Sequence, residues 1–180
     1  MSLDLSHISI RPVTVFYLKM ENAPDVLLPE DKNISFEQLQ RPIGKERYLG
    51  YYEKVGLKVN WLDRYFLEES ELLNKINDPG VSVFVMKVNG AEAGFLELVR
   101  EEDFVEILYF GLFPEFIGKG LGKYFLHWSI RKAWSFDPKW IQLNTCELDH
   151  ENALPSYKKS GFVHYKTTTE QRRVLKNPFR

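Results

Sequence analysis

A glycine-rich turn in the middle of the chain, Gly118–Lys123, most constrains what this sequence can fold into. The apolar run Phe104–Phe110 before it has the composition of a strand, and the segment Tyr124–Trp128 after it begins an amphipathic helix. Backbone N–H groups in the first turn of a helix have no partner inside the helix, and glycines let an anion approach the main chain closely. The sequence therefore predicts a strand, a turn and a helix start that bind a phosphate-bearing ligand. The alternative is a glycine-rich connection that binds nothing.

The spacing of this turn excludes the two commonest phosphate-binding motifs. A P-loop needs a glycine where Ile117 stands and a serine or threonine where Tyr124 stands. A dinucleotide fingerprint that begins at Gly118 needs its third glycine at the position of Lys123. The turn therefore points to a different class of phosphate ligand.

The rest of the chain reads as alternating short strands and helices. Strands are predicted at 13–18, 81–88, 93–100, 104–112, 140–146 and 162–168, with a short extra strand beginning at 34–36. Helices are predicted at 43–55, 69–76 and 119–135, with a further short helix that Asn152 caps and Gly161 ends. The residues Asn89 and Gly90 are typical of a tight hairpin, so the strands from 81 to 112 are antiparallel. A crossover through the helix 119–135 makes the next strand parallel to its predecessor.

These elements predict one α+β domain over residues 1–180, with a central mixed sheet of about seven strands flanked by about four helices. We expect the two ends of the chain, 1–10 and 171–180, to be loose.

Charge and composition exclude several classes of function. The chain has 24 basic and 25 acidic residues, so it offers no global argument for binding nucleic acid or an anionic membrane. The single cysteine, Cys146, rules out an internal disulfide and fits a reducing, cytoplasmic setting. The histidines show no metal-ligand spacing, so we expect no metal. No apolar run approaches the ~18 residues of a membrane span, and no signal peptide is evident. The sequence leaves a homodimer open.

A second block of sequence, His150–Phe162, extends the argument from the turn to a family. Together the two blocks resemble the GNAT superfamily of acyl-CoA-dependent N-acetyltransferases over about residues 80 to 165. The family carries Q/R-x-x-G-x-G/A after its fourth strand, a frame that 117–122 fills here, and N-x-x-A-x-x-x-Y-x-x-x-G-F near its end, which 150–162 fills. Ile117 replaces the usual Arg or Gln, and His150 stands where Asn is usual.

The resemblance implies acetyl-CoA as the co-substrate. Its pyrophosphate would bind at the turn and its pantetheine arm would lie along the end of the strand 104–112, with His150 as a further contact. The cofactor-binding residues implied are Leu112, Phe113, Gly118, Lys119, Gly120, Leu121, Gly122, Lys123 and His150. A free N–H near Leu112 would stabilise the oxyanion that forms on the thioester carbonyl.

Two residues are predicted to move protons. Tyr157 matches the family tyrosine that often protonates the leaving thiolate, and the alternative is that its ring only packs. Glu106 is a lone carboxylate in an apolar run, so burial would raise its pKa and suit it to act as the base. Glu97 on the neighbouring strand and a water molecule are competing candidates, and both carboxylates could instead face solvent.

The predicted function is transfer of an acetyl group to a primary amine of a small molecule or peptide, by direct attack in a ternary complex. An aromatic wall with nearby acid would suit a cationic amine, although most of its residues could simply pack on the sheet: Tyr48, Tyr51, Tyr52, Trp61, Asp63, Tyr65, Phe66, Glu68 and Glu69. The alternative function is a CoA-binding sensor or regulatory module without turnover, and a third is a nucleotide-binding domain.

Overall fold

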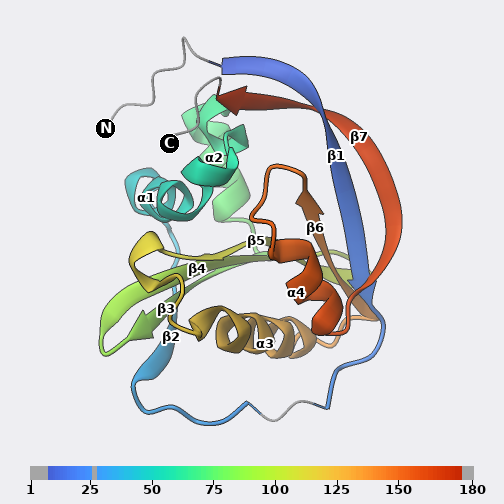
Figure 1. Ribbon diagram of the computed structural model, residues 1–180. Coiled ribbons are helices and arrows are strands. Elements are labelled where there is room, and N and C mark those ends of the chain that lie inside the picture. The colour runs from blue at the N-terminus through green and yellow to red at the C-terminus, as the bar shows by residue number, and fades with distance from the viewer. Residues whose placement is uncertain (1–7, 26–27, 176–180) are drawn as a thin grey trace.

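A computed structural model describes residues 8–25 and 28–175 of the chain, and it confirms the predicted α+β class. One seven-stranded sheet carries helices on both faces (Figure 1). The strands are β1 (Ile8–Met20), β2 (Ile34–Gln38), β3 (Val81–Val88), β4 (Ala91–Arg100), β5 (Phe104–Leu112), β6 (Trp140–Cys146) and β7 (Val163–Leu175). The helices are α1 (Lys45–Gly56), α2 (Glu69–Ile76), α3 (Leu121–Trp134) and α4 (Ala153–Lys159), with short 3₁₀ turns η2 (Leu57–Val59), η3 (Asp63–Phe66) and η4 (Pro114–Phe116).

The order of strands in the sheet is β2-β3-β4-β5-β6-β1-β7. All neighbours are antiparallel except β5 and β6, which are parallel because α3 connects them. The predicted hairpins and the predicted parallel crossover are therefore confirmed. The chain's first described strand lies between its last two, an arrangement that no local pattern in the sequence indicates.

Both end strands are longer than the sequence predicted. Residues 8–10 and 171–175, expected to be loose, lie in β1 and β7, which pair from Ile8 with Leu175 to Lys19 with Val163. The predicted strand 162–168 covers the exposed first half of β7, and the missed half is more buried. The polar run Gln171, Arg172 and Arg173 hid that half, because it has no alternation of apolar and polar residues. The remaining expected loose residues, 1–7 and 176–180, lie outside the described part of the chain.

Two apolar cores hold the helices against the sheet. On one face α3 packs on β5 and β6 through Phe125, Leu126 and Ile130. On the other face α1 and α2 cover β3, β4 and β5. Val55 of α1 lies so close to Gly111 that a side chain at 111 would collide with it, which is why β5 needs a glycine there. None of the described helices is both long and apolar enough to cross a membrane.

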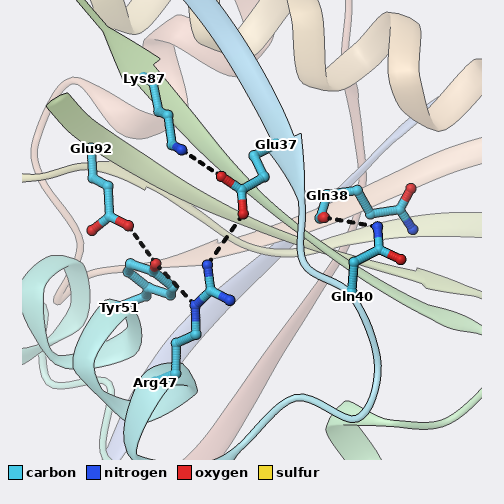
Figure 2. A network of polar contacts seen from close by, with 7 residues as sticks. All are labelled: Glu37, Gln38, Gln40, Arg47, Tyr51, Lys87 and Glu92. Carbon is cyan, nitrogen blue, oxygen red and sulfur yellow. Dashed lines mark hydrogen bonds and ion pairs between the residues drawn. The ribbon is translucent and has the colours of Figure 1, made fainter. Parts of the chain in front are cut away.

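A polar network on the surface ties α1 to the β2–β3–β4 edge of the sheet (Figure 2). Arg47 of α1 pairs with Glu37 of β2 at 3.2 Å, and Lys87 of β3 binds the same carboxylate. Tyr51 of α1 donates its hydroxyl to Glu92 of β4 at 2.6 Å. These contacts and the core beneath them place the C-terminal end of α1 over β5, beside the site described next.

Candidate active site

The two parallel strands at the centre of the sheet separate before they end. Their pairing runs from Phe104 with Trp140 to Ile107 with Leu143 and stops there, although β5 continues to Leu112. A bulge in β5 at the same level explains the separation: Tyr109 pairs with Glu97 of β4 and Ile107 with Leu98, so one residue of β5 is extra. A bulged strand bends. The result is an opening through the sheet, occupied by a cavity of about 620 Å³.

The main chain of Leu112 faces this opening. The next residue, Phe113, donates its N–H to the carbonyl of Ala93 on β4 at 2.8 Å. Successive amides along a strand point in opposite directions, so the N–H of Leu112 points into the gap beside β6. The Phe113 ring is buried and stacks on Tyr51 of α1. Of these two predicted residues, Leu112 lines the cavity and the Phe113 side chain belongs to the core.

The glycine-rich turn enters α3 at one end of the cavity. Gly118 and Gly120 have φ of 80° and 77°, a left-handed conformation that favours glycine. Gly120 is the N-cap residue of α3, and no side chain caps the helix, so the first N–H groups of α3 stay available. Gly122 and Lys123 line the cavity. Open space lies where side chains would stand on Gly118 and Gly120, as a bound anion would require.

The ring of His150 lines the cavity from the loop before α4. Its Nδ1 accepts the N–H of Asn152 at 3.1 Å. The Asn152 side chain makes no capping bond, contrary to the sequence prediction, because Asn152 itself already has helical dihedral angles. Lys119 extends over the Phe116 ring, 5.0 Å from its centroid, instead of lining the cavity. Among residues 8–25 and 28–175, no group of three or more His, Cys, Asp or Glu side chains is placed to hold a metal ion.

Tyr157 reaches the cavity from α4, on the same side of the sheet as α3 (Figure 1). The helix holds it through a bond from the Phe162 N–H to its carbonyl, and its ring packs edge-on against Phe162. Burial raises the pKa of the Tyr157 hydroxyl well above its usual value, and the charge of Asp149 adds to the rise. A phenol is protonated at neutral pH in any case, so Tyr157 holds a proton to donate, and the rise makes it a weaker acid than a free tyrosine.

Glu106 does not line the cavity, but it is hydrogen-bonded to Asn144, which does. Its Oε1 accepts bonds from Gln142 Nε2 at 3.1 Å and from Asn144 Nδ2 at 3.3 Å. Burial raises the pKa of this carboxyl, while the two amide donors oppose the rise. Asn144 lines the cavity, whereas Glu106 does not. Any exchange of a proton between Glu106 and the cavity therefore needs a water molecule beside Asn144.

Glu97, the competing carboxylate, is held in a buried cluster. It is fully buried, its Oε1 accepts from Arg64 Nη2 at 2.7 Å, and its Oε2 accepts the hydroxyl of Tyr48. Arg64 also lies over the ring of Tyr109. Both carboxylate oxygens are occupied away from solvent, so Glu97 stabilises the wall formed by α1 and η3 and is not available as a base.

The predicted aromatic wall is mostly core. Tyr48, Tyr51 and Tyr52 are buried against Phe95 and its neighbours. Trp61 is the member of that set that lines the cavity, with its ring 4.8 Å from that of Tyr109. Of the three acidic residues predicted beside this wall, only Asp63 lines the cavity. Glu68 caps α2, and Glu69 pairs with Lys45.

Several residues that line the cavity were not predicted from the sequence. They are Lys54, Lys58, Asn60, Tyr109, Asn144, Cys146 and Arg172. Asn144 and Cys146 could have been found, because they follow one another by two residues at the carboxyl end of the predicted strand 140–146 and so share one face. Arg172 could not, because it lies in the segment that was expected to be loose.

Comparisons with known proteins agree with this geometry. The model of the acetyltransferase (GNAT) family matches residues 45–162 of the chain. A GCN5-related N-acetyltransferase from Sphaerobacter thermophilus is 14% identical with a TM-score of 0.62, over 94% of this chain and 54% of that one. An aminoglycoside acetyltransferase from an uncultured soil sample, solved with trehalose, is 17% identical with a TM-score of 0.55, over 72% of this chain and 88% of that one.

A conserved protein of unknown function from Staphylococcus epidermidis is 15% identical with a TM-score of 0.59, over 94% of this chain and 64% of that one. Several similar structures are thus much longer than this chain, which spans about half to two thirds of their length. At such low identity they show a shared fold. No curated protein sequence matches the chain.

Proposed function

The chain belongs to the acetyltransferase (GNAT) family, and from that membership we propose that it transfers an acetyl group from acetyl-CoA to a primary amine of a small molecule or peptide. The observation that carries the proposal is the separation of β5 from β6 after Ile107 and Leu143. It joins the helix N-terminus on the α3 side of the sheet to the α1 side through one continuous cavity. Two substrates that enter from opposite faces would meet in this opening.

The residues around the opening supply the chemistry of direct transfer in a ternary complex. The uncapped N–H groups at the start of α3 would bind the pyrophosphate of acetyl-CoA. The N–H of Leu112 would donate to the thioester oxygen and stabilise the negative charge that develops there. When the amine attacks the thioester carbon, the carbon–sulfur bond breaks and Tyr157 would protonate the thiolate.

The attacking amine must be neutral, although an aliphatic amine is mostly protonated at neutral pH. We propose that Glu106 accepts a proton from the acceptor through a water molecule beside Asn144. The raised pKa of Glu106 supports this role, because it brings the carboxyl closer to the working pH than an ordinary glutamate.

The test is the release of free CoA thiol from acetyl-CoA with a panel of primary amines, together with the mass of the acetylated product. Thiol release that depends on the amine supports the transferase. A protein that binds acetyl-CoA in calorimetry but releases no thiol with any amine would instead be a sensor or regulatory module. A protein that binds ATP or NAD in place of acetyl-CoA would contradict both.

A further inference from the structure

The cavity changes its charge where it reaches the α1 side of the sheet. Three cationic residues line that part, Lys54 and Lys58 from α1 and η2 and Arg172 from β7, and Asp63 is the carboxylate beside them. Lys54 also lies 4.0 Å from Glu92, and Arg172 pairs with Glu170, so carboxylates outside the cavity lining balance part of this charge. In place of the acidic wall expected from the sequence, the cavity thus presents mainly cationic hydrogen-bond donors on this side, and such donors suit a ligand with an anionic group.

Arg172 is the best placed of the three cations. Its Nε and Nη2 donate to Glu170 Oε2 at 3.2 and 2.9 Å, while Tyr17 donates to the other oxygen of Glu170 at 2.7 Å. Burial lowers the pKa of Arg172 and the bond to Glu170 raises it, with a net rise, so the guanidinium stays charged. These bonds fix the guanidinium through Nε and Nη2, and within residues 8–25 and 28–175 Nη1 makes no hydrogen bond. Nη1 can therefore donate to a ligand carboxylate with little loss of side-chain entropy.

Arg172 reaches the cavity that occupies the opening between β5 and β6. Arg172 lines the same cavity as Cys146 at the end of β6 and Asp63 at the start of η3. Leu175, at the end of β7, donates its N–H to Asn60 Oδ1 at 2.9 Å and so ties this strand to η2 (Figure 1 shows β7 ending near the helices of the α1 face). Cys146 follows Asn144 by two residues on the same face of β6. Arg172 therefore lies on the face of the sheet that carries Asn144 and Cys146, two strands away from them and four positions further along β1, and it reaches the same cavity.

We propose that the amine acceptor also carries a carboxylate, as an amino acid or short peptide does, and that Arg172, supported by Lys58, binds that group. This inference rests on the proposed function. The amine would lie toward Asn144 and the carboxylate toward β7.

The same charges also help the reaction. Positive charge close to an amine disfavours its protonated form and so lowers its pKa. A free carboxylate in the acceptor would raise the pKa of its amine, and pairing with Arg172 cancels that effect, so a larger fraction of the amine is neutral and ready to attack. Lys54 contributes less to binding, because it extends over the Phe113 ring at 4.7 Å from the centroid.

The experiment compares matched amines on the wild type and three variants. The pairs are phenylalanine with phenethylamine, lysine with cadaverine, and alanyl-phenylalanine with its C-terminal amide. The variants are Arg172→Gln, Lys58→Gln and, as control, Lys139→Gln, whose exposed side chain pairs with Asp103 at the other end of β6. Steady-state thiol release gives kcat and KM for each amine and the KM for acetyl-CoA, and thermal unfolding checks that each variant is folded.

We expect the wild type to favour the acid-bearing member of at least one pair. Arg172→Gln should raise KM for that amine by about 10 to 100-fold, the range for loss of a charge-assisted hydrogen bond. It should leave KM for the member without a carboxylate, and KM for acetyl-CoA, nearly unchanged, and Lys58→Gln should act in the same direction but less. A role of Arg172 that is only structural, through Glu170, would instead lower activity on both members of a pair. If Arg172→Gln fails to fold, Arg172→Lys and Lys58→Gln carry the comparison.

Thiol release with the amines that lack a carboxylate that equals or exceeds release with every acid-bearing partner would overturn this inference and leave the acetyltransferase standing. Absence of thiol release with all amines, while acetyl-CoA still binds, would instead count against the proposed function itself.

Discussion

At the scale of single residues, burial acts on the two proposed proton carriers in the same direction but with opposite consequences. It raises the pKa of both Tyr157 and Glu106. For the carboxylate the rise strengthens the affinity for the proton that it would accept. The phenol is protonated at neutral pH in any case, so for Tyr157 the rise lowers its acidity, and donation to the thiolate depends on its position. The two groups also belong to opposite faces of the sheet: Tyr157 comes from α4, and Glu106 points away from the α3 face because its neighbours Val105 and Ile107 lie in the core beneath α3. Each would thus lie on the side where the proposed mechanism needs its proton transfer.

The first prediction concerns Tyr157. Tyr157→Phe keeps the ring that packs on Phe162 and removes only the hydroxyl. We expect kcat to fall on the order of 10²-fold, the low end for one positioned acid, with little change in the affinity for acetyl-CoA. Steady-state kinetics and calorimetry measure the two quantities, and single-turnover mixing shows whether chemistry limits the rate. An unchanged single-turnover rate would make Tyr157 a packing residue.

The second prediction concerns Glu106 and pH. Below its raised pKa the carboxyl is protonated and cannot act as a base, so kcat/KM should rise as pH increases through that pKa. The acceptor amine also titrates, but its effect cancels in the ratio of wild type to Glu106→Gln. We expect this ratio to be near one at low pH and to climb to a plateau on the order of 10².

A ratio near one at every pH would assign the proton transfer to water alone. A ratio that is constant with pH, arises from KM for the amine and shrinks with salt would mean that Glu106 only attracts the cationic amine.

At the scale of elements, the start of α3 is the feature that the cofactor would use. Gly120 has a positive φ, and the space beside it is open. Gly120→Leu should weaken acetyl-CoA binding strongly, because the side chain would strain the backbone and occupy the place of the pyrophosphate. Ile117→Ala, at an exposed position of the same loop, should do much less. Calorimetric titrations with equal, small losses for both variants would contradict the assignment of the turn.

The attachment of α1 and η3 to the sheet supports a fourth prediction, on stability. Glu97 is buried with Arg64, so Glu97→Gln would leave a buried guanidinium without its counter-charge and should destabilise the fold by about 3–5 kcal/mol. Glu37→Gln breaks the exposed pairs with Arg47 and Lys87 and should change the melting temperature far less (Figure 2). Urea unfolding of both variants measures the contrast, and similar losses would mean that the buried cluster has no special part in holding η3.

The parts of the fold and site that the sequence predicted are those marked by local sequence signals. The bounds of β3, β5, β6 and α2 agree with the predicted ranges 81–88, 104–112, 140–146 and 69–76, because glycine, proline and asparagine mark their ends. The proposed cofactor side of the site was likewise visible in local motifs. On the proposed acceptor side the sequence indicated Trp61 and Asp63 but not Arg172, which reaches the cavity through the pairing of β7 with β1, and long-range pairing leaves no local signal.

At the scale of the whole molecule, the position of β1 makes the fold depend on contacts between the two ends of the chain. β1 pairs with β6 on one side and with β7 on the other. Without β1, β7 would have no partner strand and Arg172 would lose its place. The acceptor side of the site can therefore form only when the first and last strands have come together, which is slow for contacts so distant in sequence.

The fifth prediction tests this dependence with a chain that lacks residues 1–21. Val13, Val15 and Leu18 of β1 are fully buried. Burial of one such side chain contributes about 1.5–3 kcal/mol, so losing the strand removes much of a typical total stability of about 5–15 kcal/mol. We expect the shortened chain to lose cooperative unfolding, and a synthetic peptide of residues 8–20 to restore both folding and thiol release. A peptide with asparagine at the three buried positions is the control and should restore neither. A shortened chain that unfolds at the same urea concentration as the full chain would show that β1 is dispensable for the sheet.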